Sequence, residues 1–209
     1  TRGYVSVWYP DAADDAGAQV VTVSGNVTLD PVPLYRVPDL PPPPYQGPVP
    51  GRRTAVIGDS LVQQSTTAIR RALEPAGPVS VVGVSGQRTE QMRPVAEKYA
   101  DTRPDTVVVA LGNNDLLQGR SAEATLADLG RMVDRFPRPA CVVLVNLTTH
   151  TANGDFNVAA TALDAAIPGL AAERPWLRIA DWNAEVARML AENPDGLAWF
   201  TDGLHLQPV

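Results

Sequence analysis

The 209-residue chain, with 44% hydrophobic residues, is long enough to bury one full-sized core but hardly two. Its formal net charge of -6 and the lack of any basic run argue against nucleic acid as a partner. The sequence has no apolar stretch of the roughly 18 residues that a membrane-spanning helix needs, and its single cysteine, Cys141, excludes an intramolecular disulfide.

The first 53 residues differ in composition from the rest of the chain. Two short strands are predicted at 4–9 and 19–23, because both runs are rich in β-branched and aromatic residues, so 1–30 is predicted to be a β-rich extension. The next segment, 31–53, contains four consecutive prolines, which exclude a helix or a central strand and predict an extended, semi-rigid linker. The sequence leaves open whether the extension belongs to the main domain or to a preceding one.

From Thr54 onward, short apolar runs alternate with segments of helical period. The apolar runs are rich in β-branched residues and lie at 54–57, 79–84, 106–111, 140–147 and 177–180. The helical segments lie at 62–74, 89–99, 121–135, 156–172 and 183–191. Continuous apolar strands separated by amphipathic helices predict an α/β domain over 54–209, with a parallel sheet covered on both faces.

In such a sheet, functional residues collect at the carboxyl ends of the strands. Ser60 lies there, in Gly58-Asp59-Ser60-Leu61 directly after the first strand. Near the other end of the chain, Asp202 precedes His205 by three residues. Catalysis by a serine nucleophile needs a hydroxyl, an imidazole that takes its proton and a carboxylate that orients the imidazole. These residue types therefore predict an acyl-transfer site.

Such a site must also stabilise the negative charge that develops on the carbonyl oxygen of the substrate. Three loops offer hydrogen-bond donors for this oxygen. One is the backbone N–H of Ser60, and the second is the loop at Gly86, where the lack of a Cβ lets the backbone approach a substrate. The third is a side-chain amide in Gly112-Asn113-Asn114-Asp115. The loops follow successive strands, so we expect the donors to converge.

Four blocks of the sequence resemble, in the same order, the blocks of the SGNH (GDSL) hydrolase family. They are Gly58-Asp59-Ser60-Leu61, Gly86, Gly112-Asn113-Asn114-Asp115 and Asp202-Gly203-Leu204-His205. The resemblance covers residues 54–208 and implies a three-layer α/β/α sandwich with a central parallel sheet, the flavodoxin-like fold of that family. It also implies a serine esterase that hydrolyses or transfers acyl esters without a metal or other cofactor. Ser60 does not lie in a Gly-x-Ser-x-Gly elbow, which disfavours an ordinary α/β-hydrolase.

The resemblance implies a role for each matched residue. Ser60 would be the nucleophile, and His205 the general base that later protonates the leaving alcohol. Asp202 would orient His205; the alternative is that Asp202 only stabilises its loop while a backbone carbonyl orients the imidazole. The N–H groups of Ser60 and Gly86 and the side-chain amide of Asn114 would form the oxyanion hole.

Other residues of these blocks have structural roles in this interpretation. Either Ser60 or Asp59 could cap the helix that follows, since both residue types favour the N-cap position. The family spacing Gly-x-Asn-Asp selects Asn114 as the oxyanion donor, which leaves Asn113 as a turn residue. Asp115 is expected to brace its loop.

Three further residues are candidates for lining the substrate site. Arg88 follows Gly86 by two residues and is expected to be an exposed cation that could bind a substrate carboxylate. His150 follows the fourth strand and is the only histidine besides His205, so it competes for the role of base or lines the substrate. Trp199 lies close to the Asp-x-x-His block. Each of the three could equally be an ordinary surface or packing residue.

A finer resemblance lies in the second half of the chain. The pattern Val143-Leu144-Val145-Asn146, Asn157, Asp181-Trp182 and 199–206 is similar to that of SGNH domains attached to membrane acyltransferases. Those domains act on bacterial cell-envelope polysaccharides. This resemblance implies an acylated carbohydrate as substrate, an extracytoplasmic or cell-envelope location, and a tethering role for the proline-rich linker.

The sequence therefore predicts a serine esterase whose acyl-enzyme forms on Ser60 and whose substrate is a small acyl ester or an acylated carbohydrate. One alternative is an O-acyltransferase domain that modifies cell-envelope carbohydrate, and a more remote one is a non-catalytic polysaccharide-binding module. The family normally has a further helix after its Asp-x-x-His block, whereas this sequence ends at Val209. Loss of that helix and cover by the N-terminal extension both remain open.

Overall fold

A computed structural model of the chain describes residues 34–35, 52–136, 140–193, 200 and 202–206. In this part of the chain, a six-stranded sheet has the order β1-β6-β5-β4-β2-β3. The strands β2 to β6 are parallel to one another, and β1 is antiparallel to β6 at the edge. The strands are β1 (Leu34–Tyr35), β2 (Thr54–Gly58), β3 (Val79–Gly83), β4 (Thr106–Ala110), β5 (Cys141–Val145) and β6 (Leu177–Ala180).

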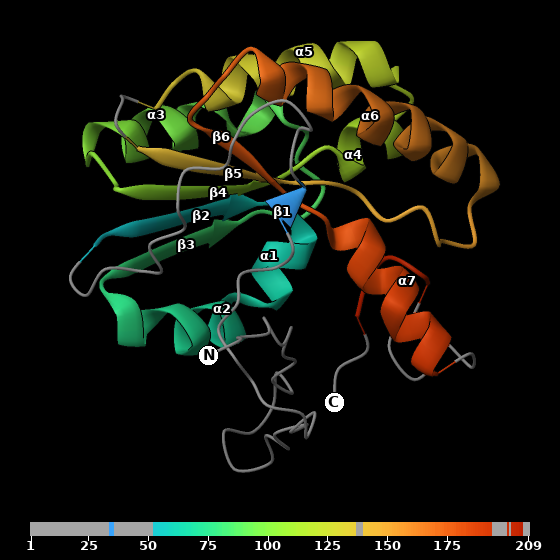
Figure 1. The fold of residues 1–209 in the computed structure, drawn as a ribbon, viewed down its shortest axis with the longest axis horizontal. Coiled ribbons are helices and arrows are strands. Elements are labelled where there is room, and N and C mark those ends of the chain that lie inside the picture. Colours follow the sequence, from blue (N-terminus) through green and yellow to red (C-terminus); the bar gives the residue numbers. More distant parts are fainter. Residues whose placement is uncertain (1–33, 36–51, 137–139, 194–199, 201, 207–209) are drawn as a thin grey trace.

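Helices cover both faces of this sheet and complete a three-layer α/β/α sandwich. Figure 1 shows α3, α5 and α6 over one face, and α1 and α2 under the other. The helices are α1 (Ser60–Gln64), α2 (Thr66–Leu73), α3 (Arg93–Asp101), α4 (Asn113–Leu117), α5 (Ala122–Val133), α6 (Gly154–Ala172) and α7 (Trp182–Glu192). Short 3₁₀ turns lie at Glu74–Ala76 and Glu90–Met92.

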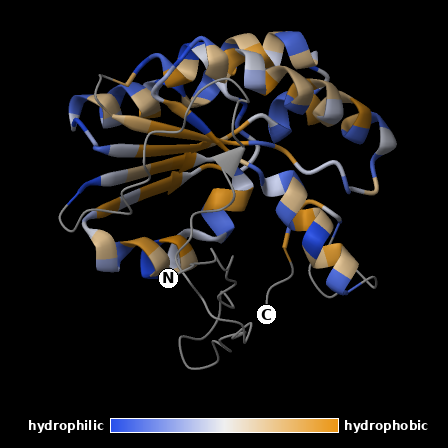
Figure 2. Cartoon of the chain, in the orientation of Figure 1, coloured by the Kyte–Doolittle hydropathy of each residue, from blue (hydrophilic) through white to orange (hydrophobic). Residues whose placement is uncertain are grey.

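The main core lies between the sheet and the helices α3, α5 and α6. The central strands contribute side chains with no exposed surface, among them Ile57, Val107, Val109 and Leu144. Figure 2 shows the apolar strands at the centre and hydrophilic residues along the outer sides of the helices. The continuous apolar runs of the sequence therefore form strands because both of their faces are covered.

The predicted α/β fold and the order of its strands and helices are confirmed, with three local differences. The predicted helix 62–74 is two helices, which meet at Ser65. Thr66 bonds its hydroxyl to the carbonyl of Val62, and Ser and Thr compete with the helical backbone in this way. A short helix, α4, forms in the predicted oxyanion loop. Two residues of the predicted linker form β1 and pair with β6. β1 lies at the edge of the sheet, where nearby prolines are tolerated.

The two strands predicted at 4–9 and 19–23 lie outside the described residues. In the part of the chain that the structure does describe, no helix combines the length and apolar character that crossing a membrane would require.

Candidate active site

The loops that follow β2, β3 and β4 start at the same level of the sheet. β2 lies between β3 and β4, and the last residue of β2 is paired with the last residues of its two neighbours. Ser60, Gly86 and Asn114 each follow this level within a few residues. The register of the sheet thus gives the three loops a common edge from which to converge, as the sequence predicted.

Ser60 is the first residue of α1, and Asp59 is the N-cap. The Oδ1 atom of Asp59 accepts a hydrogen bond from the N–H of Leu61 at 3.1 Å. Of the two capping residues that the sequence allows, the structure therefore selects Asp59. The Ser60 hydroxyl is not used for capping and is directed to another partner.

That partner is His205, from the far end of the chain. The Oγ atom of Ser60 lies 2.9 Å from Nε2 of His205, and Nδ1 of His205 lies 2.8 Å from Oδ2 of Asp202. The structure therefore brings Ser60 to a histidine that lies 145 positions later in the sequence and to the aspartate that orients it. A carboxylate on Nδ1 favours the tautomer in which Nε2 carries a lone pair toward the hydroxyl.

Asp202 is held by the turn that it begins. Its Oδ1 atom accepts hydrogen bonds from the N–H of Leu204 at 2.9 Å and from the N–H of His205 at 2.6 Å. Partial burial opposes ionisation of Asp202, but the hydrogen bonds from the backbone and side chain of His205 outweigh it and hold the pKa of this carboxyl below its usual range. Asp202 therefore remains an anion that can orient the imidazole.

Gly203, inside the same turn, is packed against the loop after β5. Its φ of +79° favours glycine, and a Cβ here would lie 2.7 Å from Cα of Thr151 and 2.9 Å from the carbonyl oxygen of His150. Asn157 in turn fixes Thr151 through hydrogen bonds to its N–H, its hydroxyl and its carbonyl. The turn that carries His205 thus lies against a loop that is itself well bonded.

Gly86 has a backbone conformation that favours glycine. Its φ is +74°, and a Cβ built on it would meet no atom of the described residues within 4 Å, its chain neighbours apart. The backbone conformation therefore favours glycine here, and the protein leaves the space beside it open. Two glutamines bond to this loop: Oε1 of Gln63 accepts from the N–H and hydroxyl of Ser85 at 2.8 and 2.7 Å, and Nε2 of Gln118 donates to the carbonyl of Gly86 at 2.8 Å.

The prediction that Asn113 is a turn residue is wrong. Asn113 is buried at the start of α4, and its Nδ2 atom donates to Oδ2 of Asp59 at 3.1 Å. Burial raises the pKa of Asp59 above its usual range, although the hydrogen bonds from Asn113 and Leu61 oppose this shift. The bond links the loop of Asn114 to the loop of Ser60 through two buried side chains.

Asp115 braces its loop, as predicted. It has no exposed surface, and its Oδ2 atom accepts hydrogen bonds from the N–H and hydroxyl of Thr89 at 2.8 and 2.9 Å. Burial raises the pKa of Asp115, while the bonds from Thr89 and the nearby Arg120 guanidinium oppose the shift. Because Thr89 closes the segment that begins at Gly86, this contact links the second and third loops.

The structure places two of the three predicted substrate-lining residues. Arg88 is half-buried, whereas the sequence predicted an exposed cation. Its Nε atom is enclosed and has no hydrogen-bond partner among the described residues. His150 is exposed, and its backbone adjoins Gly203 of the turn that carries His205. Trp199 lies outside the described residues.

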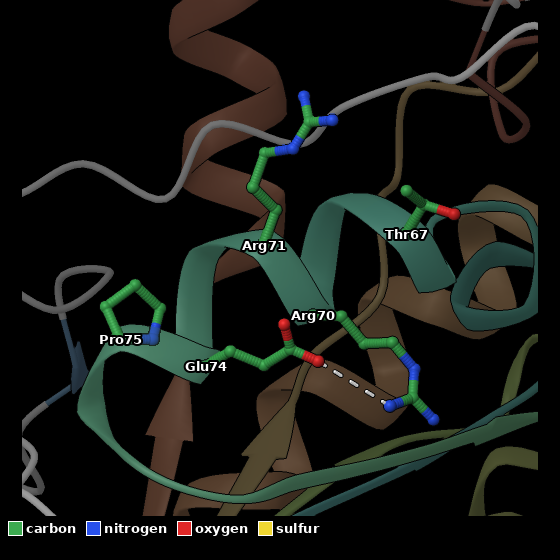
Figure 3. Close-up of a pocket in the computed structure, with 5 residues that line it drawn as sticks. All are labelled: Thr67, Arg70, Arg71, Glu74 and Pro75. Atoms are coloured by element: carbon green, nitrogen blue, oxygen red, sulfur yellow. Dashed lines mark ion pairs between the residues drawn. The ribbon is translucent and has the colours of Figure 1, made fainter. Parts of the chain in front are cut away.

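Two hollows on the described surface lie away from Ser60, His205 and Asp202. One, of about 410 Å³, lies on the outer side of α2 and its following turn, and Figure 3 shows its five lining residues with the Arg70–Glu74 ion pair. The other, of about 280 Å³, lies between α6 and the ends of β5 and β6 and includes Asn146, Asp164 and Asp181. Neither is lined by Ser60, so neither bears on the Ser60 site.

Sequence reasoning missed several residues that support the site. Gln63, Thr89, Asn113 and Gln118 all bond to one of the three loops. A buried asparagine beside the predicted oxyanion donor could have been suspected of a polar partner. Exposed glutamines on short helices carry no such signal, because their type is common on any solvated helix face.

A serine, a histidine and an aspartate within hydrogen-bond distance, at the carboxyl edge of an α/β/α sandwich, form the arrangement of a serine hydrolase. The family model of the GDSL-like lipase/acylhydrolases matches residues 56–209. The chain belongs to this family, as the sequence predicted. It is accordingly an enzyme of the SGNH serine-esterase class, which acts on ester bonds.

Solved structures with the same fold include three bacterial proteins. A member of the lipolytic G-D-S-L family from Veillonella parvula has 17% identity and a TM-score of 0.63, with 75% of this chain and 90% of that chain covered. An acetylxylan esterase from Geobacillus stearothermophilus has 16% identity and a TM-score of 0.64, with 77% and 89% covered.

The third is the C-terminal catalytic domain of peptidoglycan O-acetyltransferase A from Streptococcus pneumoniae. It has 22% identity and a TM-score of 0.58, with 78% of this chain and 83% of that chain covered. At these identities the likeness concerns the fold. No curated protein matches the chain in sequence.

Proposed function

We propose that Ser60, His205 and Asp202 are the catalytic triad of this esterase and that an acyl-enzyme forms on Ser60. The observation that carries the proposal is the continuous pair of contacts, 2.9 Å from Ser60 to His205 and 2.8 Å from His205 to Asp202. A structural serine has no need of an imidazole that is itself oriented by a carboxylate. His205, rather than His150, is therefore the proposed base.

In the first half of the reaction, Oγ of Ser60 attacks the ester carbonyl while its proton passes to Nε2 of His205. Asp202 accepts the Nδ1–H hydrogen bond and stabilises the imidazolium. The tetrahedral intermediate then collapses: the bond from carbon to the alkoxy oxygen breaks, and His205 returns the proton to that oxygen. The alcohol leaves, and the acyl group stays on Ser60.

In the second half, a water molecule takes the place of the alcohol. His205 removes its proton, the water oxygen attacks the acyl carbon, and the bond to Ser60 breaks as His205 returns the proton to Oγ. The products are a carboxylic acid and the free enzyme. An acceptor hydroxyl in place of water would make the same step a transfer.

The proposed oxyanion hole consists of the N–H groups of Ser60 and Gly86 and the Nδ2 amide of Asn114. Its support is the common level at which the three loops leave the sheet and the contacts that tie each loop to the next. Donors fixed before the reaction need no reorganisation when the charge develops.

As substrate we propose an acyl ester of a carbohydrate. Proteins with this fold include an acetylxylan esterase and a peptidoglycan O-acetyltransferase domain. Arg88, whose enclosed Nε has no hydrogen-bond partner among the described residues, is proposed to bind an anionic group of the substrate, and His150 and Trp199 are proposed to line the site. The same likeness supports an extracytoplasmic or cell-envelope location, with the proline-rich linker as a tether.

The test is hydrolysis of p-nitrophenyl acetate, butyrate and octanoate, with Ser60→Ala as the matched variant and a fluorophosphonate as a covalent probe. Turnover and labelling that both disappear in Ser60→Ala would support the proposal. Turnover that survives in Ser60→Ala would refute it. The lack of both in the native chain would favour a non-catalytic carbohydrate-binding module.

Acyl transfer to a sugar is the second candidate function. It is favoured by the fold shared with the peptidoglycan O-acetyltransferase domain. An acylated donor ester would be supplied with chitooligosaccharide or xylooligosaccharide, and acylated product would be sought by mass spectrometry. Product formation that exceeds hydrolysis would make transfer the main reaction, and hydrolysis alone would exclude it for these acceptors.

A further inference from the structure

We infer that Gln63 and Gln118 are positioning residues that clamp Gly86 from both sides and thereby fix its N–H toward the oxyanion. The inference rests on the proposed function, because it assumes that this N–H is an oxyanion donor. Both glutamines act through the backbone of the loop and neither is proposed to contact the substrate.

The first side of the clamp is Gln63 on α1. Its Oε1 atom accepts two hydrogen bonds from Ser85, from the N–H at 2.8 Å and from the hydroxyl at 2.7 Å. Ser85 directly precedes Gly86, and the peptide bond between them carries the N–H of Gly86. Two bonds to one acceptor restrain both the backbone and the side chain of Ser85.

The second side is Gln118, the C-cap residue of α4. Its Nε2 atom donates to the carbonyl oxygen of Gly86 at 2.8 Å, on the peptide bond that follows the glycine. The N–H of Gly86 thus lies between two anchored groups, Ser85 before it and the Gly86 carbonyl after it.

Gly86 needs such restraint because little else acts on it directly. Apart from the chain neighbours of Gly86, no atom of the described residues lies within 4 Å of the place where a Cβ would be, and φ is +74°. A glycine without side-chain packing can adopt many backbone conformations. A donor that moves between conformations stabilises an oxyanion less than a fixed donor.

The clamp also sets Gly86 relative to the other two proposed donors. Gln63 lies on α1, three residues after Ser60, and Gln118 is the C-cap of α4, four residues after Asn114. Each glutamine is thus attached to the short helix that contains another proposed donor. The two side-chain amides therefore fix the position of Gly86 relative to the helices of the other two proposed donors.

The opposite polarity of the two bonds supplies a charge-matched test. Gln63 accepts, so Gln63→Glu keeps its function, whereas Gln118 donates, so Gln118→Glu loses it; both variants add one negative charge beside the same loop. Gln63→Met and Gln118→Met remove the bonds without adding charge. The four substitutions fall on two exposed positions, Gln63 and Gln118, so the fold is expected to tolerate them.

We expect kcat on p-nitrophenyl acetate to fall about tenfold in Gln118→Glu, Gln118→Met and Gln63→Met, with KM within about twofold of the native value. Gln63→Glu should stay within about threefold of the native kcat. The affinity for a trifluoromethyl ketone, whose serine adduct carries an oxyanion, should fall in parallel with kcat/KM. Melting temperatures should change by about 2 °C or less.

An equal loss in the two glutamate variants would assign the effect to charge and overturn the inference, as would native kcat in both methionine variants. A loss confined to KM or to the melting temperature would also overturn it. Ser60→Ala, assayed in parallel, separates the two proposals: activity that survives there refutes the triad, whereas native kcat in the methionine variants with Ser60 still essential refutes only the clamp.

Discussion

The two halves of the proposed site are built in different ways. The nucleophile half, which carries Ser60, Gly86 and Asn114, grows out of three adjacent central strands and is cross-linked by buried carboxylates. The base half is the turn from Asp202 to His205. It is held by bonds within the turn and by contact with the loop after β5.

The packing beneath the halves differs as well. The nucleophile half rests on the main core, whereas the base half is flanked by Phe200 and Leu206, which pair as an isolated bridge. These two belong to a small separate cluster with Val186 of α7, and Leu204 alone joins the turn to the main core. We infer that the base half can be perturbed without unfolding the sheet, while the nucleophile half cannot.

The largest effect is expected in the base half itself. His205→Gln should lower kcat by about 10⁴-fold or more, because it removes the imidazole that is hydrogen-bonded to the Ser60 hydroxyl. Asp202→Asn should lower kcat by about 10² to 10⁴-fold, since an amide favours the wrong imidazole tautomer. Steady-state kinetics, with circular dichroism to verify the fold, would measure both.

The same experiment, run against pH, tests the charge of Asp202. Hydrogen bonds hold the pKa of Asp202 below its usual range, so Asp202 is expected to stay ionised well below neutral pH. The acid limb of log(kcat/KM) should therefore have a slope of about 1, from a single ionisation other than that of Asp202. A slope near 2 would mean that protonation of Asp202 also limits the activity, contrary to the geometry. Native activity in His205→Gln would assign the base to another residue.

In the nucleophile half, Asn114→Ala should lower kcat by about 10²-fold and leave KM nearly unchanged, because the lost donor acts on the developing charge. Asn113→Ala is the matched variant one residue earlier. It removes the bond to buried Asp59 and should lower the free energy of unfolding by about 1–3 kcal/mol with a smaller loss in kcat. If instead Asn113→Ala shows the large loss of kcat and Asn114→Ala the loss of stability, Asn113 rather than Asn114 is the oxyanion donor.

The sequence predicted the nucleophile half in outline because its parts are local. Ser60, Gly86 and Asn114 each follow an apolar run, and the order of strands brings such positions to one edge. The sequence could not show that Asn113 reaches Asp59 or that Gln118 reaches Gly86. Those contacts depend on loop conformations, such as φ of +74° at Gly86, that no periodic pattern encodes.

In the base half, the sequence indicated Asp202 and His205 but not what supports them. The contact between Gly203 and the loop at Thr151 joins segments about fifty residues apart, and nothing in either segment signals the other. The separate cluster around Val186 also has no signature, because an apolar face on α7 is equally consistent with packing on the sheet.

A matched pair of core substitutions would test whether the halves are mechanically distinct. Val109→Ala in β4 and Val186→Ala in α7 each remove the volume of two methyl groups from a fully buried position. Val109→Ala should lower the free energy of unfolding by about 1–3 kcal/mol without changing kcat of the folded enzyme. Val186→Ala should lower kcat by roughly three- to tenfold at a smaller cost in stability.

Urea unfolding and kcat at a temperature well below the transition would be measured for both variants. Equal losses of stability with unchanged kcat in each would show that the small cluster does not position His205. A loss of kcat in Val109→Ala would show that the main core controls both halves.

The smallest effect on kcat is expected at Asp164 of α6, beside the loop that supports the base half. Burial raises the pKa of Asp164 to about 7, with the N–H of Leu147 opposing and the charge of Asp181 adding to the shift. Between the ordinary value of 3.8 and about 7, the native state keeps a proton that the unfolded state has released. The free energy of unfolding should therefore fall as pH rises through this window and level off above it.

Asp164→Asn removes this titration and keeps an acceptor for the N–H of Leu147, which donates to Oδ1 at 3.0 Å. The variant should be more stable than the native chain at pH 8 by about 1–3 kcal/mol, and the gain should shrink toward pH 5. Asp155→Asn, exposed in the first turn of the same helix, should change stability by about 0.5 kcal/mol or less at both pH values. If the free energy of unfolding has the same pH dependence in the native chain and in Asp164→Asn, folding does not raise the pKa of Asp164. Leu147 begins the loop that contains His150 and contacts Gly203. A change in kcat over the same pH window would therefore show that ionisation of Asp164 affects the turn that carries His205.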